Sequence, residues 1–337
     1  MKCSTQNRLH WICILRLVNM FKFKTSSEKT KKVMSDIASG KLGNTDFENE
    51  CVDKVKDLTK HDEVRITSSG NNSIFIALSS IEGDIIIPDQ GGWHGFKQIA
   101  KFLNKNIITL KTDLGLINTD YIDELELNDD SALIFTSFAG YTAEQDIKSI
   151  SKYCKNNNIT TIEDASAGIG DEKGILGNGK YSDIIIASTG SPKIINVGSG
   201  GFIAASNPEI FKKTALPQKL SKTNEIICGG ICCELENVGE KLELTLNATE
   251  HLKKRIPNTI HANKRGVNVI IPHSDAKSIS WELKKTLTTD KSGFITTCPN
   301  YNRIKQKAIA IEIKNLDYDC LKKEYLDIII KEVNSQL

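Results

Sequence analysis

Short apolar runs that alternate with helical patterns constrain this chain more than any other feature. Each run is brief and rich in isoleucine, as expected of strands that are buried on both faces. Between the runs lie amphipathic helical patterns, for example at 143–157. Strands that alternate with helices indicate an α/β fold with a mostly parallel central sheet and helices on both faces. The runs are 84–88, 106–110, 132–136, 160–163, 182–187 and 201–204.

The regions that flank these runs predict further parts of the fold. The chain has 337 residues, which is enough for a large domain and a smaller one. Upstream, helical spacing over 27–60 with a break at 40–44 predicts two helices. Downstream of 211 the pattern loosens into a helical stretch at 224–252 and a last helix from about Tyr318, with short strands between them at 267–271 and 308–313.

We therefore predict a smaller α+β domain at the C-terminal end, with the N-terminal helices packing near it. The predicted division is an N-terminal extension (1–19), a helical segment (20–60), a large α/β domain (61–211) and a small α+β domain (212–337).

Composition excludes several classes of partner. The net charge is +2, so there is no broad electrostatic case for nucleic acid or for an anionic membrane surface. The apolar stretch 11–18 is too short to span a bilayer, Arg16 interrupts it, and no small-residue cleavage site follows. A start at Met20 would make the preceding residues an extension of little structural meaning. We expect a cytoplasmic protein with neither a nucleic-acid nor a membrane partner.

The cysteines predict neither disulfides nor a metal site. There are nine of them, an odd number at irregular spacing. Cys228, Cys232 and Cys233 form a cluster, but the sequence offers no further ligands of the kind that a metal site needs. We interpret them as small buried apolar side chains.

Chemically capable side chains follow several of the apolar runs. In an open parallel sheet, ligands bind beyond the carboxyl ends of the strands. Asp164 follows one run, Ser188 and Lys193 follow the next, and Trp93 follows the run at 84–88. A turn of small residues, 70–72, opens the first helix of the predicted sheet. These strand ends therefore offer an acid, a lysine with hydroxyls, an aromatic ring and a small-residue turn.

This set matches the needs of pyridoxal 5′-phosphate (PLP): a lysine amine, a carboxylate for the pyridine nitrogen and an anion cradle. Lys193 would form the Schiff base and Asp164 would keep the ring nitrogen protonated. Ser188 would add a hydroxyl to the phosphate cradle and Trp93 would stack on the ring. Backbone N–H groups at the helix start would bind the phosphate; they belong to Gly70, Asn71 and Asn72. Each residue alone also fits a structural role, and only their joint placement favours the cofactor.

The order of the motifs resembles a known family. The motifs are SGNNSIFIAL (69–78), GDIIIP (83–88), IEDAS (162–166), and Ser188 followed by Lys193 and GSGG (198–201). Over roughly 36–206 they resemble the DegT/DnrJ/EryC1/StrS aminotransferases, within the fold type I PLP enzymes.

The resemblance implies the same roles for these residues. Lys193 corresponds to the Schiff-base and proton-transfer lysine, and Asp164 to the pyridinium partner. Two departures stand out. Ala167 occupies the position where the family has Gln or His, which touches the cofactor's ring oxygen, and the family's Asn-Tyr-Arg segment after the Gly-rich loop has no counterpart. The chain after Ser206 also matches the family poorly.

The sequence therefore predicts an aminotransferase, a homodimer by resemblance, that takes an amino group from an amino acid and gives it to a keto acceptor such as a sugar nucleotide. Two alternatives stay open. One is a lyase, decarboxylase or aldolase that acts on an amino acid, with Arg303 gripping the α-carboxylate; Arg303 fits a surface ion pair equally well. The other is a non-catalytic PLP-binding protein.

Overall fold

The computed structural model describes residues 21–42 and 45–337, which form two compact units. The larger unit holds 25–243 and 301–304; within the described part, the smaller holds 21–24, 244–300 and 305–337. The predicted extension at 1–19 and the alternative start at Met20 lie outside the described residues.

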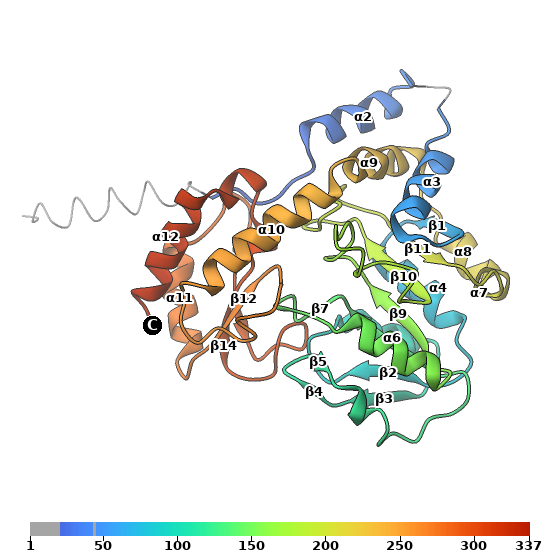
Figure 1. Cartoon of the computed structure of the whole chain (residues 1–337). Coiled ribbons are helices and arrows are strands. Elements are labelled where there is room, and N and C mark those ends of the chain that lie inside the picture. The colour runs from blue at the N-terminus through green and yellow to red at the C-terminus, as the bar shows by residue number, and fades with distance from the viewer. Residues whose placement is uncertain (1–20, 43–44) are drawn as a thin grey trace, which may run out of the picture. The chain divides into compact units, whose positions relative to one another are not determined.

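A seven-stranded sheet forms the centre of the larger unit (Figure 1), in the order β1-β11-β10-β9-β6-β2-β3. Neighbours from β10 to β3 pair in parallel, and β11 runs antiparallel to both β1 and β10. The mostly parallel α/β sheet predicted from the sequence is confirmed. Its strands are β1 (Glu63–Thr67), β2 (Ile85–Pro88), β3 (Ile107–Leu110), β6 (Ala132–Thr136), β9 (Thr160–Asp164), β10 (Ile184–Ser188) and β11 (Gly201–Ala205).

Helices pack on this sheet and shield its apolar side chains. Helix α4 (Gly70–Ser79) packs on β10 and β11, α5 (His94–Phe102) on β2 and β3, and α6 (Ile147–Asn156) on β9. The resulting core is almost wholly aliphatic, with fully buried isoleucines such as Ile85, Ile134 and Ile162. Burial on both faces explains why these strands lack polar alternation.

The predicted helix at 143–157 is too long at its start. Residues Ala143–Glu144 form strand β8, which pairs with β7 (Phe138–Ala139). Helix α6 begins only at Ile147, because the Asp146 side chain accepts a hydrogen bond from the Ser149 N–H and caps it there. Short elements between the main strands are β4 (Thr112–Asp113), β5 (Leu116–Ile117) and the 3₁₀ turn Thr119–Tyr121.

Two N-terminal helices occur on either side of the predicted break, α2 (Glu28–Ala38) and α3 (Phe47–Thr59). Both pack against α9 (Glu225–Leu235), whose cysteines 228, 232 and 233 are buried, and all three helices belong to the larger unit. The segment 212–243 therefore lies in that unit by its contacts; the predicted division into functional domains stays a prediction. Between these elements lie α7 (Glu209–Lys213) and α8 (Ala215–Leu220), and α10 (Val238–Lys253) follows α9.

The smaller unit is an α+β unit with its own core. Its antiparallel sheet has the order β12-β14-β13, and the core includes Phe21, Leu252 and Phe294. Strand β13 had no clear sequence signal. The elements are β12 (Val269–Pro272), α11 (Ala276–Thr286), β13 (Ile295–Cys298), β14 (Ala308–Ile311), the 3₁₀ turns Ile313–Asn315 and Tyr318–Leu321, and α12 (Lys323–Asn334).

Within the described ranges, 21–42 and 45–337, no helix combines the length and the apolar character needed to cross a membrane. They also contain no group of three or more His, Cys, Asp or Glu side chains arranged to hold a metal ion.

Candidate active site

The carboxyl edge of the parallel strands carries the candidate site. Asp164 is the last residue of β9 and Ser188 is the last residue of β10. Because β9 and β10 are parallel neighbours, these two side chains reach the same edge of the sheet. Ser69, two residues after β1, is the N-cap of α4 and forms a bridge with Gly200, just before β11.

A cavity of about 220 Å³ lies at this edge. Among the described residues that line it, Lys193 is the only lysine and Asp164 the only acid. The cavity thus brings together most of the site residues predicted from the sequence: Gly70, Asn71, Trp93, Asp164, Ser188 and Lys193. Asn72 and Arg303 are not part of its lining.

The turn at 69–72 has a close-packed geometry. A Cβ added to Gly70 would lie 2.5 Å from the Ser188 Cβ, so only glycine fits at the start of α4. Ser69 Oγ accepts a hydrogen bond from the Asn72 N–H at 3.2 Å, and the Asn72 side chain donates to Ser68 Oγ at 2.6 Å. Asn72 therefore contributes to the cap of α4, while Gly70 and Asn71 face the cavity.

Trp93 is fixed by its neighbours. Its Nε1 donates to Asn71 Oδ1 at 2.9 Å, which ties the indole to the turn at 69–72. A Cβ on Gly95 would lie 2.4 Å from the same Nε1, so the indole rests against bare backbone. The ring is held in place at the cavity wall, as a stacking aromatic requires.

The Asp164 carboxylate is held by one oxygen only. Its Oδ1 accepts hydrogen bonds from the Ser166 N–H at 3.0 Å and from Ser166 Oγ at 2.5 Å. Ser166 Oγ in turn accepts from the Ser188 N–H at 2.8 Å, which links the ends of β9 and β10. Within the described part of the chain, Asp164 Oδ2 has no hydrogen-bond partner. Asp164 Oδ2 can therefore accept a hydrogen bond from a donor group in the cavity.

Glu163, the neighbour of Asp164, braces the end of β9. Its buried carboxylate accepts hydrogen bonds from Ser137 Oγ, the Gly177 N–H and Ser182 Oγ, at 2.6, 2.9 and 2.7 Å. Burial nevertheless raises the pKa of Glu163 above its usual value. These three bonds fix the strand end from which Asp164 projects.

The Lys193 amine contacts a residue that the sequence did not point to. Lys193 Nζ donates a hydrogen bond to Tyr141 Oη at 3.2 Å. Burial works to lower the pKa of Lys193, but Tyr141 and Asp164 outweigh it, so the pKa is raised above its usual value. Tyr141 follows the strand run at 132–136, a strand end that the sequence reasoning passed over.

Arg303 reaches Tyr141 from a distant part of the sequence. Its guanidinium carbon lies 4.5 Å from the centre of the Tyr141 ring, and the residue is 8% exposed. The segment 301–304 is anchored by Tyr301, whose Oη donates to the Pro88 carbonyl and whose carbonyl accepts from the Gly91 N–H. Arg303 is therefore a buried side chain and not an exposed one.

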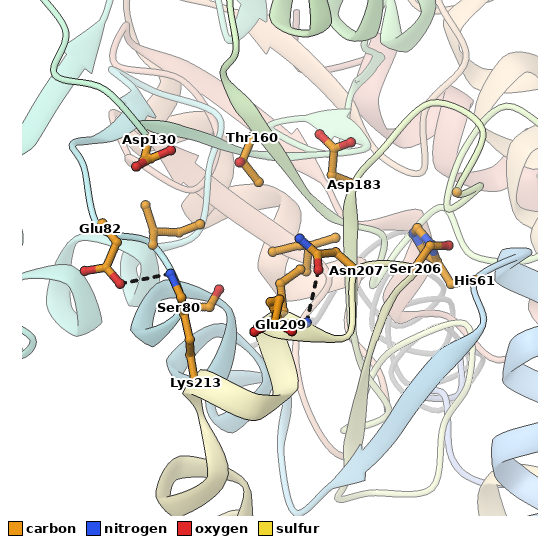
Figure 2. Close-up of a pocket in the computed structure, with 14 residues that line it drawn as sticks. His61, Ser80, Glu82, Asp130, Thr160, Asp183, Ser206, Asn207, Glu209 and Lys213 are labelled. Carbon is orange, nitrogen blue, oxygen red and sulfur yellow. Dashed lines mark hydrogen bonds and ion pairs between the residues drawn. The ribbon is translucent and has the colours of Figure 1, made fainter.

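A second cavity, of about 440 Å³, lies at the opposite, amino edge of the sheet (Figure 2). Several of its polar side chains already bond to protein groups. Lys213 pairs with Glu82 at 3.1 Å, Asp183 accepts from the Thr161 N–H and hydroxyl, and buried His61 bonds Ser206 Oγ and the Ser182 carbonyl. Burial lowers the pKa of His61 below its usual value. Lys213 is the one lysine among the described residues that line this cavity, and its amine is already paired with Glu82.

Comparisons with known proteins define the class of this fold and site. The model of the DegT/DnrJ/EryC1/StrS aminotransferase family matches residues 24–226, and that of the MJ1341 family C-terminal domain matches 239–334. This chain belongs to the DegT/DnrJ/EryC1/StrS aminotransferase family.

Similar solved structures agree on the fold. A SepCysS–SepCysE N-terminal domain complex is 16% identical, with 96% of each chain covered and a TM-score of 0.72. NtdA from Bacillus subtilis with bound PMP is 16% identical over 96% of this chain and 83% of that one, TM-score 0.67. A structure titled SPT with PLP is 10% identical over 94% and 86%, TM-score 0.72. The fold is that of fold type I PLP enzymes, and family and neighbours point to PLP as the cofactor.

Proposed function

We propose that this chain is a PLP-dependent aminotransferase that moves an amino group from an amino-acid donor to a keto acceptor, with Lys193 as its Schiff-base lysine. One observation carries this proposal: Lys193, Asp164 and the turn at Gly70 line one cavity at the carboxyl edge of the sheet. The family membership supports the reaction class.

The residues of the cavity fit the cofactor group by group. Bound PLP would supply an electron sink for the substrate carbon that loses a proton. Gly70, Asn71 and Ser188 would bind the phosphate, with Asn72 capping the helix behind them, and Trp93 would stack on the ring. The free Oδ2 of Asp164 would hold the proton on the ring nitrogen. The released Lys193 amine would take the proton from Cα and return it at C4′.

Arg303 is the proposed carboxylate ligand of the donor. Its planar guanidinium can bind a carboxylate with two parallel hydrogen bonds. It lies over Tyr141, which contacts Lys193, so a donor bound there would have its Cα near the amine. For the acceptor we propose a sugar nucleotide, by resemblance to the family.

A screen of amino donors tests the reaction. Purified PLP-loaded protein is mixed with single amino acids, and the visible absorbance of the bound cofactor is followed together with the products. We expect at least one donor, glutamate first, to convert the cofactor to its amine form with release of one keto acid per site. Release of CO₂ or an aldehyde would favour a decarboxylase or an aldolase. No conversion with any donor would favour a non-catalytic binding protein.

We also propose a homodimer, in which the second chain completes each site. Twofold pairs are the commonest closed assemblies of soluble proteins, and fold type I sites are generally built at such an interface. Mass in solution, measured at the assay concentration and alongside activity, should give twice the chain mass of 37.3 kDa. A fully active monomer would rule the dimer out.

A further inference from the structure

Tyr141 has an unusual backbone conformation. It lies in the tight connection between β7 and β8, where its N–H donates to the Phe138 carbonyl at 3.1 Å. Its φ is +66°, in the left-handed region that glycine and asparagine adopt easily and an aromatic residue rarely does. Strain of this kind persists where a side chain has a function that outweighs it. The contacts of the Tyr141 side chain should therefore show such a function.

The side chain of Tyr141 joins two groups of the candidate site. Its hydroxyl accepts the hydrogen bond from Lys193 Nζ, and its ring lies under the Arg303 guanidinium. The adjacent Gly140 makes this approach possible, because a Cβ there would lie 2.7 Å from the Arg303 carbonyl oxygen. Together with Asp164, these are the charged or titratable groups that act on the Lys193 amine.

The structure of PLP suggests a role for the hydrogen bond between Lys193 and Tyr141. In PLP the ring hydroxyl is carried by the carbon next to the one that bears C4′, the atom to which the lysine nitrogen bonds. With PLP bound, a side chain within hydrogen-bond distance of Nζ would therefore also be near that ring oxygen. The methyl group of Ala167 cannot make a hydrogen bond, whereas the Tyr141 hydroxyl both donates and accepts.

We propose that Tyr141 is a catalytic residue of this site: its hydroxyl orients the Lys193 amine for proton transfer and supplies the hydrogen bond that Ala167 cannot make. Arg303 is in this respect a positioning residue, since its guanidinium covers the Tyr141 ring and limits its rotation. The inference rests on the proposed function, because it assumes that Lys193 carries the cofactor.

Tyr141→Phe tests the proposal, because it removes the hydroxyl and keeps the ring under Arg303. The full-length, PLP-loaded protein is titrated with pH, and the visible band of the lysine-bound cofactor is recorded. Loss of the hydroxyl removes an acceptor for the protonated Lys193 nitrogen, which lowers the midpoint of the titration, and a donor to the ring oxygen, which raises it. The midpoint should therefore move by roughly one pH unit, and the direction of the shift tells which of the two hydrogen bonds dominates. The kcat for amino-group transfer should fall by about 10²-fold, with the donor KM little changed.

Tyr153→Phe is the matched control. It also removes a hydrogen-bonded hydroxyl, since Tyr153 Oη donates to Asp123 at 2.5 Å, but Tyr153 lies on α6 and does not line the cavity. Its titration midpoint and kcat should equal those of the wild type.

Borohydride trapping distinguishes a failure of the proposed role of Tyr141 from a failure of the proposed function. If the wild type carries reduced cofactor on Lys193 but Tyr141→Phe has an unchanged midpoint and kcat, the role of Tyr141 is wrong and the proposed function stands. If Tyr141→Phe loses the cofactor altogether, the hydroxyl is needed for binding and the catalytic role is likewise wrong. If the wild type carries no cofactor on Lys193, the proposed function itself fails.

Discussion

Lys193→Ala is expected to lower the rate of amino-group transfer by at least about 10³-fold, because it removes both the covalent attachment and the proton-transfer group. PLP should still bind, more weakly, through the turn at 69–72 and Asp164, neither of which the substitution touches. Steady-state rates measure the first effect, and absorbance after gel filtration measures the second. Borohydride should fix no cofactor to the variant, whereas the wild type should yield a labelled peptide containing Lys193.

Lys173→Ala provides the matched control. Lys173 is an exposed lysine in the connection between β9 and β10, whereas Lys193 follows β10, and it does not line the cavity. Its removal should leave the rate, the absorbance and the labelled peptide as in the wild type. Recovery of the reduced cofactor on any lysine other than Lys193 would reject the assignment.

The central sheet could be predicted because its strands are buried on both faces. Such burial requires consecutive apolar residues, which are visible in the sequence as the isoleucine runs at 84–88 and 182–187. Each of these runs contains a strand of the sheet. The sequence signal of strand β1 is weaker, because Glu63 and Arg65 alternate with its apolar residues Val64 and Ile66 and form an ion pair with each other. The start of α6 was predicted too early because Ala143 and Glu144 suit a helix, while pairing with β7 holds them in a strand.

Candidate site residues could be predicted only where a polar or titratable side chain ends or directly follows a strand in the sequence. Asp164 and Ser188 end their strands, and a parallel sheet brings such ends together without knowledge of any side-chain contact. The contact between Tyr141 and Arg303 has no such signal. It depends on the return of 301–304 to the larger unit and on the bare backbone of Gly140, which are tertiary facts. The role of Ser166 could not be predicted for the same reason, because it depends on the hydrogen bond that its Oγ accepts from the Ser188 N–H at the end of the neighbouring strand.

Asp164→Asn is expected to lower the rate by about 10²–10³-fold, or roughly 3–4 kcal/mol of transition-state stabilisation, while the protein still binds PLP. The asparagine Oδ1 can accept the same two hydrogen bonds from Ser166, so the side chain keeps its orientation. What changes is the atom that faces the cavity. In place of Oδ2, a charged acceptor, there is an NH₂ donor, which favours an unprotonated ring nitrogen.

The effect should appear as a change in the absorbance of the bound cofactor and as a fall in kcat, with PLP affinity reduced by no more than about tenfold, or about 1.4 kcal/mol. Asp183→Asn is the control. It replaces a carboxylate at the opposite, amino edge of the same two strands, where Asp183 accepts hydrogen bonds from Thr161. That variant should lose stability and keep the rate per bound cofactor. If Asp164→Asn turned over nearly as fast as the wild type, the free Oδ2 would have no electronic role, and Asp164 would serve only to tie β9 to β10 through Ser166.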